Sequence, residues 1–526
     1  MDSVSGQIAV LDYVVIGAYL ALIIGIGVWV SRSTKSGEDL FLAGRSLTWG
    51  AIGFSLFASN ISTSTLIGLT GSAYGDGIAV SAYEWTSGIP LLILAFVFAP
   101  LFLKSRITTT PEYLDKRYSR RVRLYFSGLT IVFTVIVDTA GGLYAGAVVM
   151  QVFFPNVDIW MTCVGIGLFA GIYTAVGGLK AVVFTDVLQS VVLLTGCAVL
   201  AFMMFQDLGF SWDALQAELP DGHLNVVKPI DDPQLPWFGL FFGVWLLGFW
   251  YWVTNQYIVQ RVLGAKDLKN AQWGAILGGM LKLSPLFIMV LPGAMAVSLI
   301  PDIPQNDQVF PVMITTILPA GLTGLVLAGL IAAIMSSVDS TLNSSSTLIV
   351  HDFISDPDEE LPPEKSKRYG QMATITFMII AIAWAPLIQY AGGLWDYLQQ
   401  MFSVLVPPLV VLFLGGALWQ RGTAPAAFYT LIIGHGVGTV LFALRMIEVW
   451  PLHYTINVVI MTVVSALVFV VFSLMDDPQE VDDDVIWTRK KALDHEGGLQ
   501  GGLLSDVRLH AVVLMALILT ILVLFW

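Results

Sequence analysis

The second long apolar stretch of the chain, residues 53–71, reads GFSLFASNISTSTLIGLTG. It is long enough to cross a bilayer, which takes about 20 mostly apolar residues, yet serine, threonine and asparagine fill its middle. These side chains offer the backbone competing hydrogen bonds, so a continuous helix is disfavoured there. We therefore expect a span that is interrupted near residues 60–68, where freed carbonyl oxygens can bind a cation.

Residues 236–258 contain a second candidate for an interrupted span. Gly243 and Gly248 lie within it, next to the aromatic run 249–252. Small residues also serve helix packing in membranes, so this pattern has a structural explanation as well. If spans two to six and seven to eleven form two halves, each half opens with an interrupted segment. That correspondence is typical of transporters whose solute site lies between two repeats.

The composition places the whole chain in a bilayer. Of its 526 residues 56% are hydrophobic and only 12% are charged, against about 25% in soluble domains. The mean hydropathy of +0.79 agrees with this class. The two cysteines, Cys163 and Cys197, lie in apolar runs, which excludes a disulfide framework and a cysteine metal cluster.

Hydropathy divides the chain into 14 candidate spans. Their approximate cores are 10–30, 47–72, 79–103, 124–153, 158–177, 181–206, 236–258, 271–299, 319–350, 369–385, 396–419, 425–444, 453–474 and 509–526. The first is not expected to be a cleaved signal, because residues 1–9 contain no lysine or arginine. No loop is long enough for a separate soluble domain, so we expect one membrane domain over residues 1–526.

The basic residues indicate the orientation in the membrane. With the N-terminus outside, the inner loops contain 22 of the 25 lysines and arginines, and the exceptions are Lys228, Arg445 and Lys282. This excess on one side is what the positive-inside rule predicts for the cytoplasmic face. The even number of spans puts the C-terminus outside too. Because topology accounts for the basic residues, we expect a multi-pass protein of the cell membrane and no nucleic-acid partner.

Ionisable residues inside spans cost roughly 2.5–3.5 kcal/mol each at the bilayer centre, so they indicate either function or pairing between helices. For His435 a structural role is the better interpretation. Each of the other five ionisable residues could by itself have a structural role in pairing helices. As a group, however, they predict a polar cavity near the middle of the membrane. The set is Glu84, Asp138, Asp186, Lys282 and Asp339.

The ninth span is rich in oxygen ligands, since residues 332–346 read AAIMSSVDSTLNSSS. Ser336 is three residues from Asp339 and four from Ser340, so the three share one helix face. Hydroxyl and carboxylate oxygens suit a hard cation rather than a soft transition metal. Helix packing explains some of the serines but not Asp339.

Eight short segments follow one another in a characteristic order. They are DLFLAGR at 39–45, ASNIS at 58–62, YEW at 83–85, YTAVGGLKA at 173–181, TDV at 185–187, NQYIVQR at 255–261, SS at 336–337 and DYLQ at 396–399. In this order and spacing they resemble the sodium/solute symporter family, and specifically its sodium/sugar branch. The resemblance extends over nearly the whole chain.

The resemblance implies the leucine-transporter fold, an all-α integral membrane architecture with two inverted five-helix repeats. The first repeat would cover residues 47–206 and the second residues 236–419. One extra helix, 10–30, would precede them, and three helices in 425–526 would follow. That gives 14 transmembrane helices, in agreement with the count from hydropathy.

The resemblance also implies a sodium site between the second and ninth spans. Its matching positions are the carbonyl oxygens of Ala58, Ile61 and Ala333 and the hydroxyls of Ser336 and Ser337. Some relatives hold a second sodium, whose matching positions are Asp186, Ser336, Asp339 and Ser340. We hypothesise a second sodium here, because an acid at position 339, where such relatives carry serine, adds negative charge beside a cation. Na⁺ is the only cofactor that we expect.

The family's sugar-binding positions match in part. The residues expected to bind solute are Asn60, Thr65, Glu84, Ser87, Asp138, Tyr251, Lys282 and Gln399. Together they suit vicinal hydroxyls, each of which donates and accepts, and Tyr251 would close beneath the sugar. Glu84 and Lys282 would also balance each other's charge across the cavity. Thr65 stands in place of a glutamine, and Asp138 and Gly248 in place of asparagines. Specificity for galactose or glucose is therefore open, with a polyol, pentose or modified sugar as alternatives.

The expected activity is symport of sodium with a sugar or sugar-like solute into the cell by alternating access, and not an enzymatic reaction. ATP-driven transport is not expected, because nothing resembles a Walker phosphate-binding loop. The main alternative is sodium symport of a carboxylate or amino-acid-like solute that pairs with Lys282, although Glu84 would repel it. A channel, a sensor and an intramembrane enzyme are weaker interpretations, since no output domain and no nucleophile–base pair are visible.

Overall fold

The computed structural model describes residues 9–31, 41–153, 156–355, 361–390, 394–447, 449–493 and 505–526, and within these ranges it contains helices and no β-strand. The longer helices are α1 (Val10–Ser31), α3 (Trp49–Asn60), α4 (Thr63–Asp76), α9 (Arg120–Phe133), α10 (Ala140–Phe153), α11 (Ile159–Asp207), α15 (Leu268–Leu281), α18 (Leu322–Leu348), α19 (Pro363–Trp384), α20 (Leu394–Leu418), α21 (Ala424–Met446), α22 (Tyr454–Met475) and α24 (Val507–Leu524).

Shorter helical segments continue or connect the longer helices. The α-helical ones are α5 (Ala82–Trp85), α6 (Gly88–Ile93), α7 (Ala99–Lys104), α8 (Thr110–Arg117), α12 (Trp212–Glu218), α13 (Val244–Phe249), α14 (Gln256–Leu263), α16 (Leu291–Leu299), α17 (Val309–Ile317) and α23 (Arg489–Ala492). The π-helical ones are η3 (Leu94–Phe98), η4 (Thr134–Thr139), η5 (Gly239–Gly243), η6 (Trp250–Thr254), η7 (Leu286–Val290) and η9 (Ile349–Ile354). The 3₁₀ segments are η1 (Ala43–Arg45), η2 (Ile78–Ser81), η8 (Asn306–Gln308), η10 (Ala385–Tyr390) and η11 (Asp483–Val485).

The multi-pass membrane architecture is confirmed. Within the described residues ten helices are long and apolar enough to cross a bilayer, and α3 with α4 forms an eleventh as a bent pair. Three shorter apolar helices cover Val10–Ile26, Ile159–Leu168 and Gly239–Thr254. Every stretch expected from hydropathy coincides with one of these helices. The number of 14 crossings and the division into repeats stay predictions.

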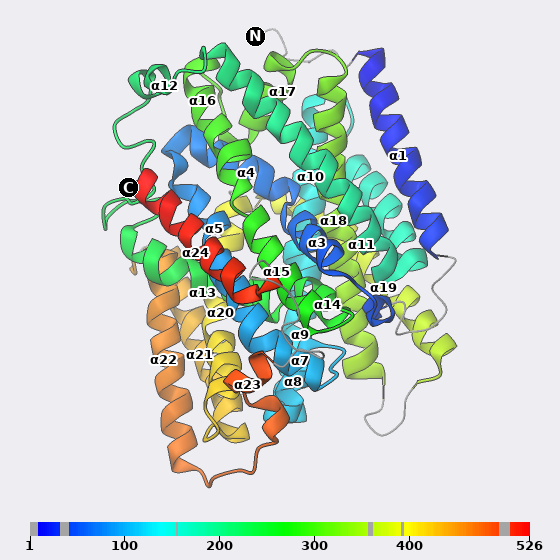
Figure 1. Cartoon of the computed structure of the whole chain (residues 1–526), viewed down its shortest axis with the longest axis vertical. Helices are drawn as coiled ribbons and strands as arrows, with labels where there is room; N and C mark the ends of the chain where they lie inside the picture. Colours follow the sequence, from blue (N-terminus) through cyan, green and yellow to red (C-terminus); the bar gives the residue numbers. More distant parts are fainter. Residues whose placement is uncertain are drawn as a thin grey trace.

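The helices form one bundle with two ends. Figure 1 places α12 and α17 at one end and α8 and α23 at the other. The helices α8 and α23 carry basic side chains, those of Lys116, Arg117 and the run 489–491. Two of the segments that were expected to face inward thus lie at the same end of the bundle. Arg32 and Lys35, expected on the same side, lie outside the described residues.

The predicted interruption of the second span is present between α3 and α4, which are bent by 63°. Ile61 leaves the helical conformation at φ −77° and ψ 86°. The hydroxyl of Ser62 then accepts a hydrogen bond from the Thr65 amide at 3.1 Å and begins α4. A serine side chain thus replaces a carbonyl of α3 as acceptor, which is why the polar sequence breaks the span.

The second interruption lies further along than expected. The glycines and the aromatic run are helical, as η5, α13 and η6, and the chain is extended only at Asn255, with φ −70° and ψ 123°. The side chain of Asn255 accepts from the Tyr257 amide and begins α14. The prediction of a broken span was right and its position was wrong, because the capping asparagine and not the glycines sets the break.

The fifth and sixth predicted spans are joined. α11 runs from Ile159 to Asp207 as one helix, where a loop was expected at Lys180. Parts of the motif segments lie outside what the structure describes, namely residues 39–40 and the side chains of 173–178, 181 and 396–397. The Gly-Gly pair at 177–178 therefore did not end the helix.

The first helix is tied to the ninth predicted span. α1 packs against α18 and α11, as Figure 1 shows at the right of the bundle. The carboxylate of Asp12, which is 1% exposed, accepts from the amides of Gly321 at 2.6 Å and Gly324 at 2.7 Å. Asp12 therefore caps the start of α18 from another helix, where backbone N–H groups lack partners and favour a negative charge.

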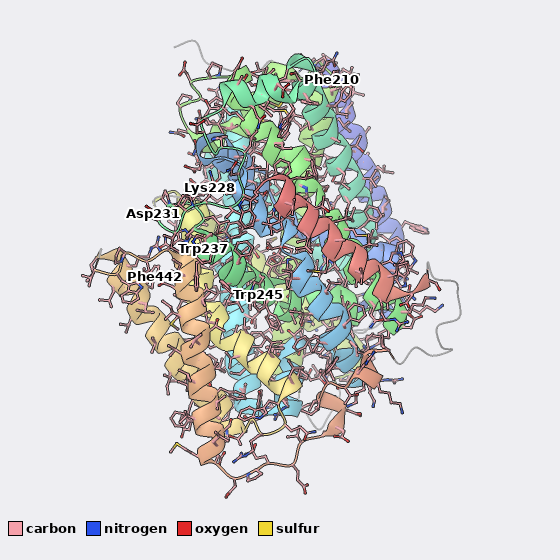
Figure 2. The ribbon with its side chains drawn as sticks, turned by 60° about the vertical axis from the view of Figure 1, so that its left-hand side comes forward. Phe210, Lys228, Asp231, Trp237, Trp245 and Phe442 are labelled. Atoms are coloured by element: carbon pink, nitrogen blue, oxygen red, sulfur yellow. The ribbon has the colours of Figure 1, made fainter. Side chains whose placement is uncertain are left out.

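A long connection covers the end of α4. Figure 2 labels Lys228, Asp231 and Trp237 on this connection, which joins α12 to η5 along the outside of the helices. Within it, the His223 carbonyl accepts from the Ile78 amide at 2.9 Å, and its ring nitrogen Nε2 lies 2.8 Å from the Ala73 carbonyl. The connection thus closes the bundle where α4 ends.

Candidate functional site

A polar cavity opens where the break between α3 and α4 faces α5, η4, η6, α18 and α20. Its empty space, with the opening to solvent included, is about 990 Å³. A span broken at this point contributes both backbone and side-chain oxygens to the cavity wall. The cavity wall is therefore polar.

The expected solute-binding residues gather at this cavity. Seven of the eight line it: Asn60, Thr65, Glu84, Ser87, Asp138, Tyr251 and Gln399. The eighth, Lys282, is fully buried next to it and donates to Glu84 Oε2 and Asn60 Oδ1. The charge balance predicted between Glu84 and Lys282 exists as a buried ion pair. What these residues bind stays a prediction.

An aromatic wall lies opposite the broken span. Trp250 and Phe402 pack with ring centroids 4.9 Å apart, and Tyr251 and Tyr257 with centroids 5.5 Å apart. The ammonium of Lys282 lies 5.7 Å from the ring centre of Trp252. The sequence singled out Tyr251 alone. The run 249–252 signalled the other rings on η6, whereas Phe402 comes from α20 and left no local signal.

The helices that carry the first expected cation site are in contact, and whether its five oxygens form a site stays a prediction. A hydrogen bond of 2.9 Å between the hydroxyls of Ser59 and Ser340 joins α3 to α18, and Ile61 and Ala333 share one buried cluster. The amides that would pair with the Ala58 and Ile61 carbonyls within a continuous helix bond elsewhere. Ser337 lines the cavity, and its hydroxyl is buried without a hydrogen-bond partner in the described part of the chain.

The second expected cation site already contains a positive charge. Asp186 is fully buried, and its Oδ2 lies 3.0 Å from Nη2 of Arg261, which is 1% exposed. Ser55 donates to the same oxygen at 2.5 Å. Arg261 Nη2 also donates to the hydroxyl of Ser340 at 2.5 Å. Nothing in the sequence indicates this pairing, because the positive-inside pattern places Arg261 in an inner loop.

Asp339 and Ser336 complete that second group. Asp339 is buried on α18, and the Ser336 carbonyl accepts from Ser340 at 2.6 Å. Ser336 belongs to both expected sites, so the two lie next to each other along one face of α18. His435 has the structural role expected of it, with the Tyr125 hydroxyl and the Leu405 carbonyl each 3.0 Å from its ring nitrogens.

Comparison with known proteins identifies the class. The family model "Sodium:solute symporter family" matches residues 40–434. The sodium/glucose cotransporter 4 of Mus musculus is 32% identical over 92% of this chain and 78% of its own length. The sodium/mannose cotransporter SLC5A10 of Bos taurus is 34% identical over 85% of this chain and 81% of its own length. The chain belongs to the sodium:solute symporter family.

Solved structures give the fold. A structure of a Na⁺-coupled sialic acid symporter in its substrate-bound outward-open state superposes with a TM-score of 0.79, at 23% identity, over 90% of this chain and 100% of that one. A nucleobase-cation-symport-1 family transporter superposes with a TM-score of 0.57, at 14% identity, over 85% of this chain and 97% of that one. The leucine-transporter fold expected from the sequence is confirmed.

Proposed function

We propose that this symporter moves a sugar or a related polyhydroxylated solute into the cell together with sodium. Two of the relatives named above are sodium cotransporters of glucose and mannose. The observation that supports the proposal is that the expected sodium site and the solute cavity both use the break between α3 and α4. The break that frees the carbonyls of Ala58 and Ile61 continues into Asn60 and Ser62, which line the cavity.

The proposed cycle uses this break. Sodium on the carbonyls of Ala58, Ile61 and Ala333 and the hydroxyls of Ser336 and Ser337 holds the broken span against α18. This shapes the cavity wall and raises the affinity for solute. Solute binding then favours the inward-facing state, which is a population shift between two conformations. Each sodium that crosses contributes roughly 2.3 kcal/mol per 100 mV.

A second sodium would use oxygens that Arg261 leaves available. These belong to Asp186, whose Oδ1 is buried without a hydrogen-bond partner among the described residues, to Ser336 and to Asp339. Such a site has two carboxylates and one guanidinium, so a sodium ion balances the remaining negative charge. Ser340 would take part only where Arg261 moves away from it.

For orientation we propose a cell-membrane protein with both termini outside and α8 and α23 in the cytoplasm. The support is the collection of basic side chains at that end of the bundle. The division into a repeat of residues 47–206 and one of 236–419, with a helix before and three after, is part of the same proposal.

Transport of a carboxylate is disfavoured. Lys282, the only lysine or arginine at the cavity in the described part, is already held by Glu84 and Asn60. Asp138 adds a further negative group. An anionic solute would have to compete for Lys282 and tolerate Asp138.

The direct test is uptake into proteoliposomes. Labelled sugars, polyols and carboxylates are offered with an inward sodium gradient, with equal sodium on both sides, and with a potassium gradient. We expect accumulation of one or more neutral or aminated sugars or polyols in the first condition alone. Gradient-independent uptake, or accumulation of carboxylates only, would contradict the proposal.

A further inference from the structure

The fixed charges at the cavity do not cancel. Glu84 and Lys282 neutralise each other as a buried ion pair. Asp138 also lines the cavity, and none of the ion pairs among the described residues includes it. Its Oδ2 is buried and accepts no hydrogen bond from the described part of the protein. Among the described residues, the cavity therefore has one acidic side chain without a protein counter-charge.

The backbone holds this carboxylate in place. Asp138 belongs to the π-helical turn η4, and its neighbour Thr139 donates to the Thr341 hydroxyl of α18 at 2.7 Å. π-helical turns of this kind are often found at functional sites. A buried polar group without a partner is costly, so a fold that keeps one here fits a ligand that supplies the partner.

We propose that the transported solute carries an ammonium group as well as hydroxyls, as an amino sugar or an amino polyol does. Its ammonium group pairs with Asp138, and its hydroxyls bond to Glu84, Ser87 and Gln399. Hydrogen bonds between charged partners are roughly twice as strong as neutral ones. This inference rests on the proposed function and names the substrate class within it.

Thr65 and Gly248 agree with this assignment. Both line the cavity and are small, and both stand where the sugar-transporter pattern has a longer amide. Compared with that pattern, the wall has three amides fewer, at positions 65, 138 and 248, and one acid more, at position 138. That combination favours a charged donor over an additional hydroxyl.

A competing role for Asp138 is to attract sodium. Thr341, which Thr139 contacts, lies one helical turn beyond Ser337 of the first cation site. In that case Asp138 would set the sodium affinity and be indifferent to the charge of the solute. The two roles give opposite results in one set of measurements.

The test compares matched solutes. D-glucose, D-glucosamine and N-acetyl-D-glucosamine, and the same three forms of galactose and mannose, compete with a labelled solute for sodium-driven uptake at mildly acidic pH, where the amines are protonated. We expect the amine of the favoured stereochemistry to compete at least about tenfold more strongly than its neutral and acetylated partners. The reverse order would overturn the inference, whereas absence of all sodium-driven uptake would instead overturn the proposed function.

Variants at one position complete the design. Asp138→Asn, which keeps the shape and removes the charge, should abolish the preference for the amine, while Asp138→Glu should retain it. A preference that survives in Asp138→Asn, or a change there in sodium dependence alone, would overturn the inference. Should Asp138→Asn fail to fold, the competition series on the unaltered protein still decides.

Discussion

The two expected cation sites lie side by side on α18 and share Ser336, yet they differ in what already occupies their oxygens. At the first, a broken span leaves carbonyls without helical partners, and the Ser337 hydroxyl has no hydrogen-bond partner in the described region. At the second, Arg261 binds Asp186 and Ser340. The acid of the second expected site thus already has a protein counter-charge, whereas the described part of the chain shows no ion pair at the first.

A pattern of ligand residues therefore does not by itself define a binding site. Serines and acids on one helix face identify oxygens of the right kind, but a distant residue decides which of them already have a partner. Arg261 lies 75 residues from Asp186 along the chain. Variants that change one site at a time measure what each set of oxygens contributes.

The largest effect is expected from removing both hydroxyls of the first site. Ser336→Ala with Ser337→Ala should lower sodium-driven uptake at least about 100-fold, because a desolvated sodium ion loses two of its five oxygens. Uptake is measured in proteoliposomes. The control is Ser344→Ala with Ser345→Ala, two buried hydroxyls further along α18 that do not line the cavity. Sodium-driven uptake that persisted in the first double variant would remove the cation assignment.

The next effect concerns Arg261. Arg261→Gln should destabilise the protein by roughly 3–5 kcal/mol, since it leaves Asp186 buried and unpaired. Thermal unfolding in detergent measures this. Sodium should raise the midpoint temperature of unfolding more in the variant than in the unaltered protein, because the ion can replace the guanidinium group beside Asp186.

A double variant tests whether the lower stability comes from loss of the Asp186–Arg261 ion pair. Asp186→Asn combined with Arg261→Gln should regain much of the lost stability and lose the extra response to sodium. If the double variant were as unstable as Arg261→Gln alone, the pair would not be the cause.

A smaller and more specific effect is expected at Asp339. Asp339→Ser should reduce the number of sodium ions carried per solute from two to one while uptake continues, because it removes one of the two carboxylates that balance a second ion. Parallel fluxes of labelled sodium and solute give the ratio. An unaltered protein that already carries one sodium per solute would refute the second site.

The smallest effect is expected at the break itself. Ser62→Ala removes the N-cap of α4 and should cost about 1 kcal/mol, raising the sodium concentration for half-maximal uptake about fivefold. Ser211→Ala removes an equivalent cap from α12, where the hydroxyl accepts from the Ala214 amide at 3.1 Å. An equal rise in the sodium concentration for half-maximal uptake in both variants would show that the break between α3 and α4 has no particular role in sodium binding.

Local chemistry explains which features could be predicted. The interruption at 61–62 was visible because its cause, a run of short polar side chains, lies in the same segment. The break at Asn255 could not be located because glycines and aromatic residues are the more familiar signs of an interrupted helix. Here a single capping side chain sets its position. The expected loop at Lys180 failed for a similar reason, since α11 continues through its glycines.

Tertiary pairing explains what could not be predicted. Nothing near Arg261 in sequence indicates that it reaches Asp186, and nothing near Phe402 indicates that it packs on Trp250. The pairing of Glu84 with Lys282 was predicted correctly, because opposite charges inside apolar spans are costly unless they pair with each other. The sequence thus identified residues that share one cavity, but it did not identify the arginine that pairs with the second expected cation site.

The contact between Asp12 and the start of α18 has a consequence for how small a working version of this protein can be. α1 lies outside both proposed repeats, yet its carboxylate receives the first amides of the helix that supplies Ala333, Ser336 and Ser337. A shortened protein that kept the two proposed repeats and omitted α1 would leave the Gly321 and Gly324 amides without this acceptor. If the proposed repeats are correct, a working version of the protein therefore needs α1 in addition to them, because α1 holds the start of α18.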